Sequence, residues 1–293
     1  MPSQERNRTL AILRSASKGK YAILAQCCYD AQSVLATIRA AEKARSPAMV
    51  QLFPVTMKQF GIHFTRFVLD ACHSASVPIS VHVDHVGTDE DIARVLDWAE
   101  QGVQVDSMMI DCSHHDTDEE NIAMAKPYCQ RAAKLGMAVE VELGRIMGGE
   151  QGVRTMDDGA LTRPEKAEQF LLELEVDMLA PSIGNIHGRY TSAPDFRLDL
   201  LDDLQGRVGP KTQANALIVL HGTDDLSDDL FRECVRRGCV KINVNSWARE
   251  PQVEHWVKRL SHDALPDVYD AGMEKFEAVC TRFFKLFGSA GKA

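Results

Sequence analysis

The chain has 293 residues and a formal net charge of −9, with 45% hydrophobic and 26% charged residues. These values fit a globular protein with a sizeable core and exclude a disordered chain, and the acidic balance without a basic stripe excludes a nucleic-acid-binding surface. The sequence has neither a run of about eighteen apolar residues that would span a membrane nor the apolar start of a signal peptide, so we expect a cytoplasmic protein without membrane contacts.

Short apolar or β-branched runs alternate with helical patterns along the chain. Eight runs are predicted as strands: 21–25, 47–53, 79–84, 106–111, 138–143, 178–183, 217–221 and 240–245. Helical patterns cover 33–43, 89–101, 119–135, 164–174 and 228–237, with four predicted starts at Thr88, Asp118, Arg163 and Ser227. Three helices are followed by a glycine suited to a left-handed end, namely Gly102, Gly136 and Gly238. Eight such units predict an α/β fold, a (β/α)8 TIM barrel, with a doubly wound open sheet as the alternative.

The segment 251–293 follows the eighth predicted strand and has its own apolar stripe. Apolar residues recur there at helical spacing: Phe276, Val279, Cys280, Phe283, Phe284 and Phe287. We expect a C-terminal helical extension whose stripe packs on the barrel or on a partner subunit. Residues 1–293 are thus expected to form a single barrel domain that includes this extension.

Ionisable and polar side chains fall at or just beyond the ends of predicted strands three to eight: Asp84, His85, Asp111, Glu142, His187, His221 and Asn243. In a (β/α)8 barrel these C-terminal strand ends form one rim, where active sites lie. Because the adjacent residues Asp84 and His85 cannot both point inward from a regular strand, we expect the strand to end there. Glu140 and Glu142 share one parity, and inward carboxylates need a cation or hydrogen-bond donors. His82 is expected to be an interior hydrogen-bonding residue.

Three imidazoles on one open rim indicate a catalytic zinc site, in which three protein ligands leave a position for water or substrate. The carboxylates of Asp111 and Glu142 indicate an oxygen-rich subsite for a second or displaced metal. A Zn²⁺ ion that binds a ketone oxygen acts as a Lewis acid and stabilises the enediolate formed when a neighbouring C–C bond breaks. A metallohydrolase would also use three histidines, so the reaction stays open on these residues alone.

Seven motifs occur in a fixed order: VHVDH at 81–85, MIDCSH at 109–114, EENI at 119–122, VELGR at 141–145, IGNIHGRY at 183–190, VLHG at 219–222 and KINVN at 241–245. In this order the sequence resembles the class II fructose-bisphosphate and tagatose-bisphosphate aldolases over nearly its whole length. The resemblance implies a lyase of glycolysis and carbohydrate metabolism that reversibly cleaves a phosphorylated ketose, with fructose 1,6-bisphosphate as the first candidate.

The resemblance also implies roles for individual residues. His85, His187 and His221 would bind the catalytic zinc, with Asp111 and Glu142 at the second metal position. Asp84 would exchange the proton of the C4 hydroxyl, and Glu150 would remove a proton from the methylene of dihydroxyacetone phosphate. The sugar phosphate would be bound by Gly188, Gly222, Thr223, Asp224, Asn243, Val244, Asn245, Ser246 and Arg249. A monovalent cation, Na⁺ or K⁺, is a second candidate cofactor, and a homodimer or homotetramer is the expected assembly.

Departures from the family pattern cluster around the phosphate. The family commonly has His-Gly-Gly/Ala-Ser-Gly where residues 221–225 read HGTDD, and a small serine where this chain has Phe53. A carboxylate about 5 Å from a phosphate dianion costs roughly 6 to 7 kcal/mol at an effective dielectric constant near 20. Two alternatives follow: an aldolase with the same chemistry and a different ketose, or a catalytically silent barrel with a binding role.

Overall fold

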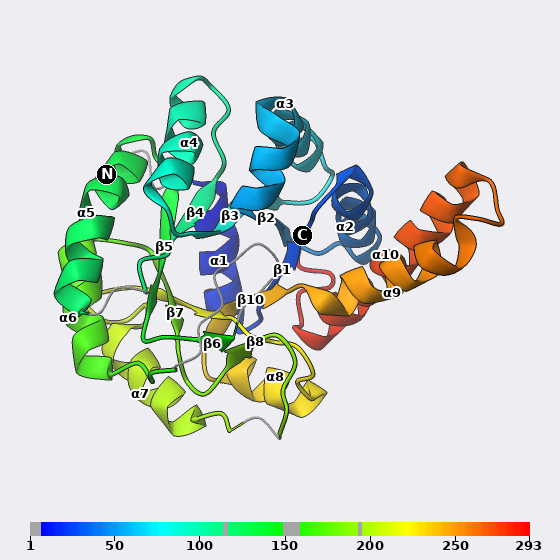
Figure 1. Ribbon diagram of the computed structural model, residues 1–293. Helices are drawn as coiled ribbons and strands as arrows, with labels where there is room; N and C mark the ends of the chain where they lie inside the picture. The colour runs from blue at the N-terminus through cyan, green and yellow to red at the C-terminus, as the bar shows by residue number, and fades with distance from the viewer. Residues whose placement is uncertain (1–6, 114–116, 149–158, 193–194) are drawn as a thin grey trace.

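Eight parallel strands close into a barrel in the order β1-β10-β9-β7-β5-β4-β3-β2 in the computed structural model, which describes residues 7–113, 117–148, 159–192 and 195–293 (Figure 1). The strands are β1 (Ile23–Cys27), β2 (Ala48–Leu52), β3 (Ile79–Val86), β4 (Ser107–Ile110), β5 (Ala138–Leu143), β7 (Met178–Pro181), β9 (Leu217–Leu220) and β10 (Cys239–Val244). A separate pair, β6 (Met147–Gly148) and β8 (Ile186–His187), forms a two-stranded sheet. The predicted (β/α)8 barrel is confirmed, and the open sheet is excluded.

The helices are α1 (Arg8–Gly19), α2 (Ala31–Ala44), α3 (Pro54–His73), α4 (Asp89–Glu100), α5 (Asp118–Lys134), α6 (Pro164–Leu174), α7 (Leu198–Val208), α8 (Asp228–Arg236), α9 (Ser246–Arg259) and α10 (Leu265–Leu286). Thr88 and Ser227 cap α4 and α8 as predicted, each accepting a backbone N–H at 3.2 Å. The predicted cap at Asp118 is wrong, because Thr117 caps α5 in a capping box with Glu120. Arg163 precedes α6 without a side-chain cap bond.

Two apolar layers build the core. Outward side chains of the strands, such as Leu24, pack against the surrounding helices, whereas Ile23, Ala25 and Met178 face the barrel interior. Helix α1, which the sequence analysis did not predict, packs Leu10, Leu13 and Ala16 into that interior group and closes the N-terminal end of the barrel. The polar interior residues therefore lie nearer the C-terminal end.

Helices α9 and α10 form the C-terminal extension, and they project from the barrel at the right of Figure 1. Helix α9 begins at Ser246 and contains Pro251, so the helical region starts five residues before the expected 251. On α10 and just beyond it, Phe276, Cys280, Phe283, Phe284 and Phe287 are buried, and Val279 is partly buried. Helix α10 packs on α2 and α9, which confirms packing of the stripe on the body of the chain.

None of the helices in the described ranges is long and apolar enough to cross a membrane.

Candidate active site

Three histidines and one carboxylate meet at the C-terminal end of the barrel. Candidate ligand atoms of His85, Glu142, His187 and His221 lie within 4.8 Å of one another, and all four residues are buried. The ring of His85 lies 4.8 Å from that of His187 and 4.9 Å from that of His221, measured between centroids. They come from β3, β5, β8 and the residue after β9. The structure thus brings together residues that the sequence only placed at separate strand ends.

Strand β3 delivers two adjacent residues to this end by an irregularity. The strand continues to Val86, so the expected strand end at Asp84 and His85 is wrong. Instead, His85 has a φ of 50°, and the pairing register with β4 shifts between Val83 and Val86. A bulge interrupts the alternation of a strand and re-aims its side chains. Asp84 and His85 can therefore both serve the same site.

The histidine nitrogens are spaced for one small cation. His85 Nε2 lies 3.2 Å from His221 Nδ1. Two nitrogen ligands of a tetrahedral zinc ion, each at 2.0 to 2.1 Å, lie about 3.3 Å apart. Glu142 adds an oxygen, since its Oε1 accepts the Ile146 N–H at 3.2 Å while its Oε2 has no hydrogen-bond partner among the described residues. This donor set fits Zn²⁺.

Asp111 lies behind His85 instead of joining the four-residue group. Its Oδ2 is 2.8 Å from His85 Nδ1, and its Oδ1 accepts the Ser113 hydroxyl at 2.8 Å. Such a carboxylate fixes the ring and leaves Nε2 toward the other histidines. The structure gives Asp111 an orienting contact, and its role at a second metal position stays a prediction.

The electrostatics of the site favour positive charge. Burial opposes a charged His85, yet the carboxylates of Asp84, Asp111 and Glu142 raise the pKa of His85 to about 10. Burial and the neighbouring Asp111 raise the pKa of Glu142 to about 7. A proton or a metal ion would relieve the same crowding of carboxylates, so binding of a divalent cation should release protons.

Asp84 is a fixed carboxylate beside the histidines. Its Oδ2 accepts the amide groups of Gln51 at 3.1 Å and Asn243 at 3.0 Å. Its Oδ1 has no hydrogen bond within the described part of the chain, with His82 Nε2 at 3.7 Å. Burial opposes ionisation, but His85 and His221 hold the pKa of Asp84 well below its usual value. Asp84 is thus held as an ionised carboxylate between the histidines above it and His82 beneath.

A second buried layer lies beneath the histidines, and the sequence analysis missed one member of it. His82 Nδ1 lies 2.8 Å from the Ser107 hydroxyl, as expected of an interior hydrogen-bonding histidine. The cation that inward Glu140 required is Lys241, whose Nζ lies 2.8 Å from Glu140 Oε2. Burial opposes ionisation of Glu140, but Lys241 and His221 lower its pKa to about 2. The parity of Lys241 with Asn243 on β10 is the signal that would have placed Lys241 inward.

The expected phosphate-binding segments lie together around Gly222. Tyr190 Oη donates to the Gly222 carbonyl at 2.8 Å and accepts the Ile186 N–H at 3.0 Å. Thr223 Oγ1 donates to the Asn243 carbonyl at 2.5 Å. Gly188 has a φ of 90°, Val244 ends β10, and Asn245 precedes α9. The loop after His221 is therefore tied to both neighbouring segments.

The acidic loop is partly neutralised. Asp225 is exposed and pairs with Arg189 at 3.1 Å, and Arg189 also binds Glu250 at 2.5 Å. Asp224 is half-buried. On α9, the Arg249 guanidinium donates to Ser246 Oγ at 3.3 Å, while its Nε is buried without a hydrogen-bond partner among the described residues. The Arg189 guanidinium thus offsets the charge of Asp225, which weakens the repulsion between Asp225 and a phosphate bound nearby.

Phe53 adjoins the histidine cluster. It is fully buried, and its ring stacks on that of His85 with centroids 6.5 Å apart and planes 17° apart. The Tyr29 ring also lies near Phe53, with centroids 5.7 Å apart, and the Tyr29 hydroxyl donates to Asn245 at 3.0 Å. Glu150 falls outside the described residues.

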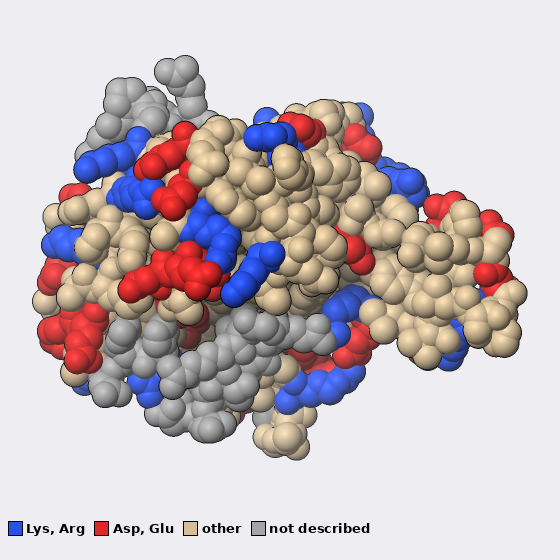
Figure 2. Space-filling view, turned by 45° about the horizontal axis from the view of Figure 1, so that its top comes forward, with Lys and Arg blue, Asp and Glu red and all other residues tan. Residues whose placement is uncertain are grey.

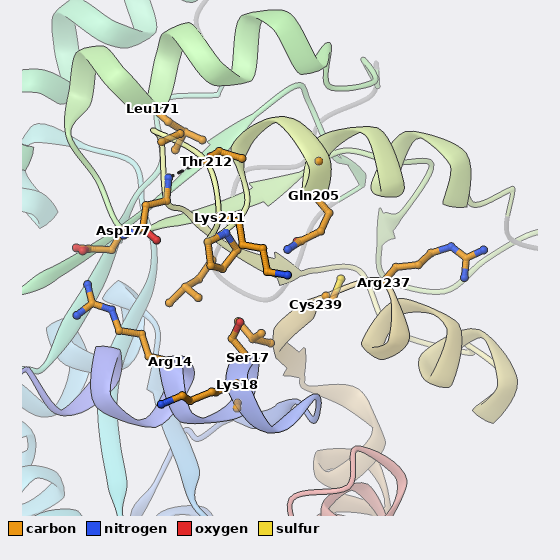
Figure 3. A pocket seen from close by; sticks show the side chains of 18 of the residues that line it. Arg14, Ser17, Lys18, Leu171, Asp177, Gln205, Lys211, Thr212, Arg237 and Cys239 are labelled. Atoms are coloured by element: carbon orange, nitrogen blue, oxygen red, sulfur yellow. Dashed lines mark hydrogen bonds between the residues drawn. The ribbon is translucent and has the colours of Figure 1, made fainter.

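A wide cavity of about 1540 Å³ opens at the opposite end of the barrel, between α1 and the starts of β7, β9 and β10 (Figure 3). Arg14 and Lys18 of α1 line one wall, and Lys211 and Gln205 line the other. None of the predicted site residues in the described ranges borders it. The side chains suited to chemistry therefore gather away from this cavity.

Known proteins match this chain over almost its full length. The family model "Fructose-bisphosphate aldolase class-II" matches residues 7–292. A Coccidioides immitis protein named as a fructose-bisphosphate aldolase is 35% identical over 100% of this chain and 97% of its own length. A sulfofructosephosphate aldolase of Alkalicoccus urumqiensis is 29% identical, covering 96% of each chain. The crystal structure of a Coccidioides immitis protein described as a fructose-1,6-bisphosphate aldolase superposes with a TM-score of 0.93 at 33% identity, over 98% of each chain.

Proposed function

Because the chain belongs to the class II fructose-bisphosphate aldolase family, whose members are metal-dependent lyases, we propose that it reversibly cleaves a phosphorylated ketose with the aid of zinc. Fructose 1,6-bisphosphate is the first candidate, giving dihydroxyacetone phosphate and glyceraldehyde 3-phosphate. The observation that carries the proposal is the convergence of His85, His187, His221 and Glu142 beside the ionised carboxylate of Asp84.

The three histidines would hold the metal, with Glu142 beside them. When bound, zinc supplies a Lewis acid that stabilises the negative charge developing on the ketone oxygen as the C–C bond breaks. Asp111 keeps His85 oriented through the 2.8 Å contact at Nδ1. Together with Glu142, it is also our proposed second metal position, as the family resemblance implies.

Asp84 would accept the C4 hydroxyl proton during cleavage and return it during condensation. Gln51 and Asn243 hold its Oδ2 at 3.1 and 3.0 Å, which fixes the carboxylate beside the histidines. A base held by its second oxygen is preorganised, so little is lost in orienting it. We assign Glu150 to the proton of the dihydroxyacetone phosphate methylene on the resemblance alone.

We place the substrate phosphate between the Gly222 loop and the first turn of α9. Asn245 makes no side-chain cap bond to α9, and the Ala248 N–H donates to the Asn245 carbonyl at 3.3 Å, so we propose that the N–H groups of Ser246 and Trp247 face the anion. Gly188, Thr223, Asp224, Asn243, Val244 and Ser246 border this place, and the buried Nε of Arg249 adds a donor. A monovalent cation, Na⁺ or K⁺, would further offset the acidic loop.

A second candidate keeps the chemistry and changes the ketose. Phe53 fills the space beside His85 where the family commonly has a small serine, and this ring favours a substrate that lacks the first phosphate. The relative named as a sulfofructosephosphate aldolase supports variation of the substrate at similar overall identity.

A panel of ketoses tests both candidates. Zinc-loaded protein is offered fructose 1,6-bisphosphate, tagatose 1,6-bisphosphate, the 1-phosphates and the free ketoses, and the released aldehyde is measured. His187→Ala should abolish turnover, whereas the matched variant His63→Ala, on an exposed position of α3, should not. Cleavage of neither bisphosphate would refute the first candidate, and cleavage of none of the panel would favour a silent barrel.

We also propose a homodimer or homotetramer built through the α9–α10 projection. Val253, Val257, Leu260 and Leu265 are exposed there, Val257 to 75%, and Figure 2 shows this projection as mostly tan, with acidic and basic groups along its edges. Sedimentation should show that Val257→Asp dissociates the oligomer, while Leu172→Asp, on exposed α6, leaves it intact. A wild-type monomer would contradict the proposal.

We propose a cytoplasmic location for the protein. All eight cysteines lie in the described part of the chain, and each is buried and outside any disulfide bond. Such thiols are typical of a reducing compartment. Fractionation of cells that produce the protein would test the location.

A further inference from the structure

Two oppositely charged residues are fully buried beneath the histidine cluster, and the proposed reaction does not use them. Glu140 lies on β5 and Lys241 on β10, three places apart in the ring of strands, so the Lys241 side chain crosses the barrel interior. Both residues have 0% exposure. Burying a carboxylate and an ammonium group is costly, so their position calls for a physical reason.

Lys241 supplies the positive charge that Glu140 needs. Its Nζ is 2.8 Å from Glu140 Oε2. Side-chain atoms of His82, Asp84 and Glu140 also lie within 4.8 Å of one another, an arrangement that could otherwise hold a metal. Because the Lys241 ammonium group already pairs with Glu140, this lower group has less need of a metal ion than the upper group of histidines.

The other oxygen of Glu140 sets the tautomer of His221. Glu140 Oε1 is 2.8 Å from His221 Nε2, and the Asn243 amide nitrogen is 3.0 Å from the same atom. A carboxylate so close to an unprotonated nitrogen would bring lone pairs together, so Nε2 carries the hydrogen and donates it to Glu140. The Asn243 amide then gives its hydrogen to Asp84 Oδ2 at 3.0 Å.

The tautomer decides which nitrogen is left for a metal. A neutral imidazole has one N–H, so His221 with a hydrogen on Nε2 offers the lone pair of Nδ1. That Nδ1 lies 3.2 Å from His85 Nε2, on the side of the histidine cluster. On the other side of the cluster, Asp111 has the same relation to His85.

We propose that Glu140 and Lys241 act as a positioning pair: Lys241 holds the Glu140 carboxylate, and Glu140 holds His221 in the tautomer and orientation that bind the metal. The inference rests on the proposed metal site. It adds a residue pair that touches neither metal nor substrate but controls one ligand. Outer partners of this kind change metal affinity by about 10- to 100-fold.

Three variants test the pair. Glu140→Gln keeps the shape of the Glu140 side chain and removes its charge, and Lys241→Met removes the ammonium group. The double variant removes both charges, so it leaves no uncompensated buried carboxylate and can be measured if Lys241→Met fails to fold. Asp177→Asn is the matched control, since Asp177 is another carboxylate near the barrel, accepting the Val139 N–H at 3.1 Å at the far end. For each, zinc affinity is measured by competition with a chelator, and the Co²⁺-substituted protein is examined by absorption spectroscopy.

We expect Glu140→Gln and the double variant to bind zinc about 10- to 100-fold more weakly and to change the Co²⁺ spectrum, while Asp177→Asn matches the wild type. The positioning role is overturned if either variant folds, binds zinc within about twofold of the wild-type affinity and has an unchanged Co²⁺ spectrum. This holds even if the melting temperature of that variant is lower. Failure of the wild-type protein to bind zinc at all is a different result, because it would overturn the proposed function as well.

Discussion

Gly222→Ala should separate two ligand-bearing segments that the fold holds together. Gly222 follows His221 and has a φ of 63°, and an added Cβ would lie 2.3 Å from the Ile186 carbonyl oxygen. Because carbon and carbonyl oxygen need about 3.3 Å, the two backbones would have to move apart by about 1 Å. Ile186 precedes His187, so the displacement would pass directly to a proposed zinc ligand.

The expected losses follow from that displacement. A shift of about 1 Å in a site can cost on the order of 100-fold in rate, so we expect kcat/KM and zinc affinity to fall by roughly 10- to 100-fold. The left-handed backbone adds about 1 to 2 kcal/mol of instability for a non-glycine residue. The assays are aldol cleavage, zinc competition with a chelator, and urea unfolding.

Gly102→Ala separates backbone strain from close approach. Gly102 has a φ of 84°, and no heavy atom of the described residues lies within 4 Å of an added Cβ. This variant should lose stability but keep zinc affinity and kcat/KM. If folded Gly222→Ala matches Gly102→Ala in both quantities within about twofold, the reasoning about the clamped segments is refuted.

Three further predictions concern Phe53, Asp177 and the cysteines. Phe53→Ser removes a fully buried ring, so it should lower the free energy of unfolding by about 3 to 5 kcal/mol. It should also raise kcat/KM for fructose 1,6-bisphosphate relative to kcat/KM for phosphate-free ketoses. If the ratio of these two kcat/KM values is unchanged, Phe53 does not select the substrate. Burial raises the pKa of Asp177, so the folded protein holds the Asp177 proton more tightly than the unfolded chain does, and the protein loses stability as pH rises from the ordinary pKa toward the raised one. Asp177→Asn should remove this pH-dependent loss when the free energy of unfolding is measured from about pH 3.5 upward. A difference in stability between variant and wild type that stays constant with pH would contradict the prediction. All eight cysteines are buried, and burial raises the pKa of Cys72 and Cys129 to about 12. Because a buried thiol is out of the reagent's reach, no thiol of the native protein should react with dithiobis(nitrobenzoate) at about pH 8, whereas all should react in denaturant; reaction of the native protein would contradict this.

The barrel was predictable because its signals are local and repeated. Short apolar runs buried along their whole length, helix caps such as Thr88 and Ser227, and glycines after helices recur along the chain. Helix α1 escaped prediction although Leu10, Leu13 and Ala16 have helical spacing, because its apolar face is explained only by the open barrel end that it covers.

The site was predictable as a set of strand ends but not as a network. The sequence placed His85 and His221 on one rim, but the bulge at His85 depends on a left-handed residue that no local pattern announced. The link from Lys241 through Glu140 to His221 joins three different strand positions across the interior. Pairings of that kind are set by barrel geometry, so parity can place each residue inward without showing its partner.

The closure of the barrel has a consequence for how the chain folds during synthesis. Strand β1 pairs with β10, for example Ile23 with Lys241, and α10 packs on α2. One edge of β1 therefore stays unpaired until more than two hundred further residues have left the ribosome. Pairing between strands so far apart in the sequence is slow. Exposed strand edges invite association with other chains, so the nascent protein should depend on chaperones until β10 emerges. The metal site includes His221, which follows β9, the neighbour of β10 in the barrel, so this site should assemble only at the end.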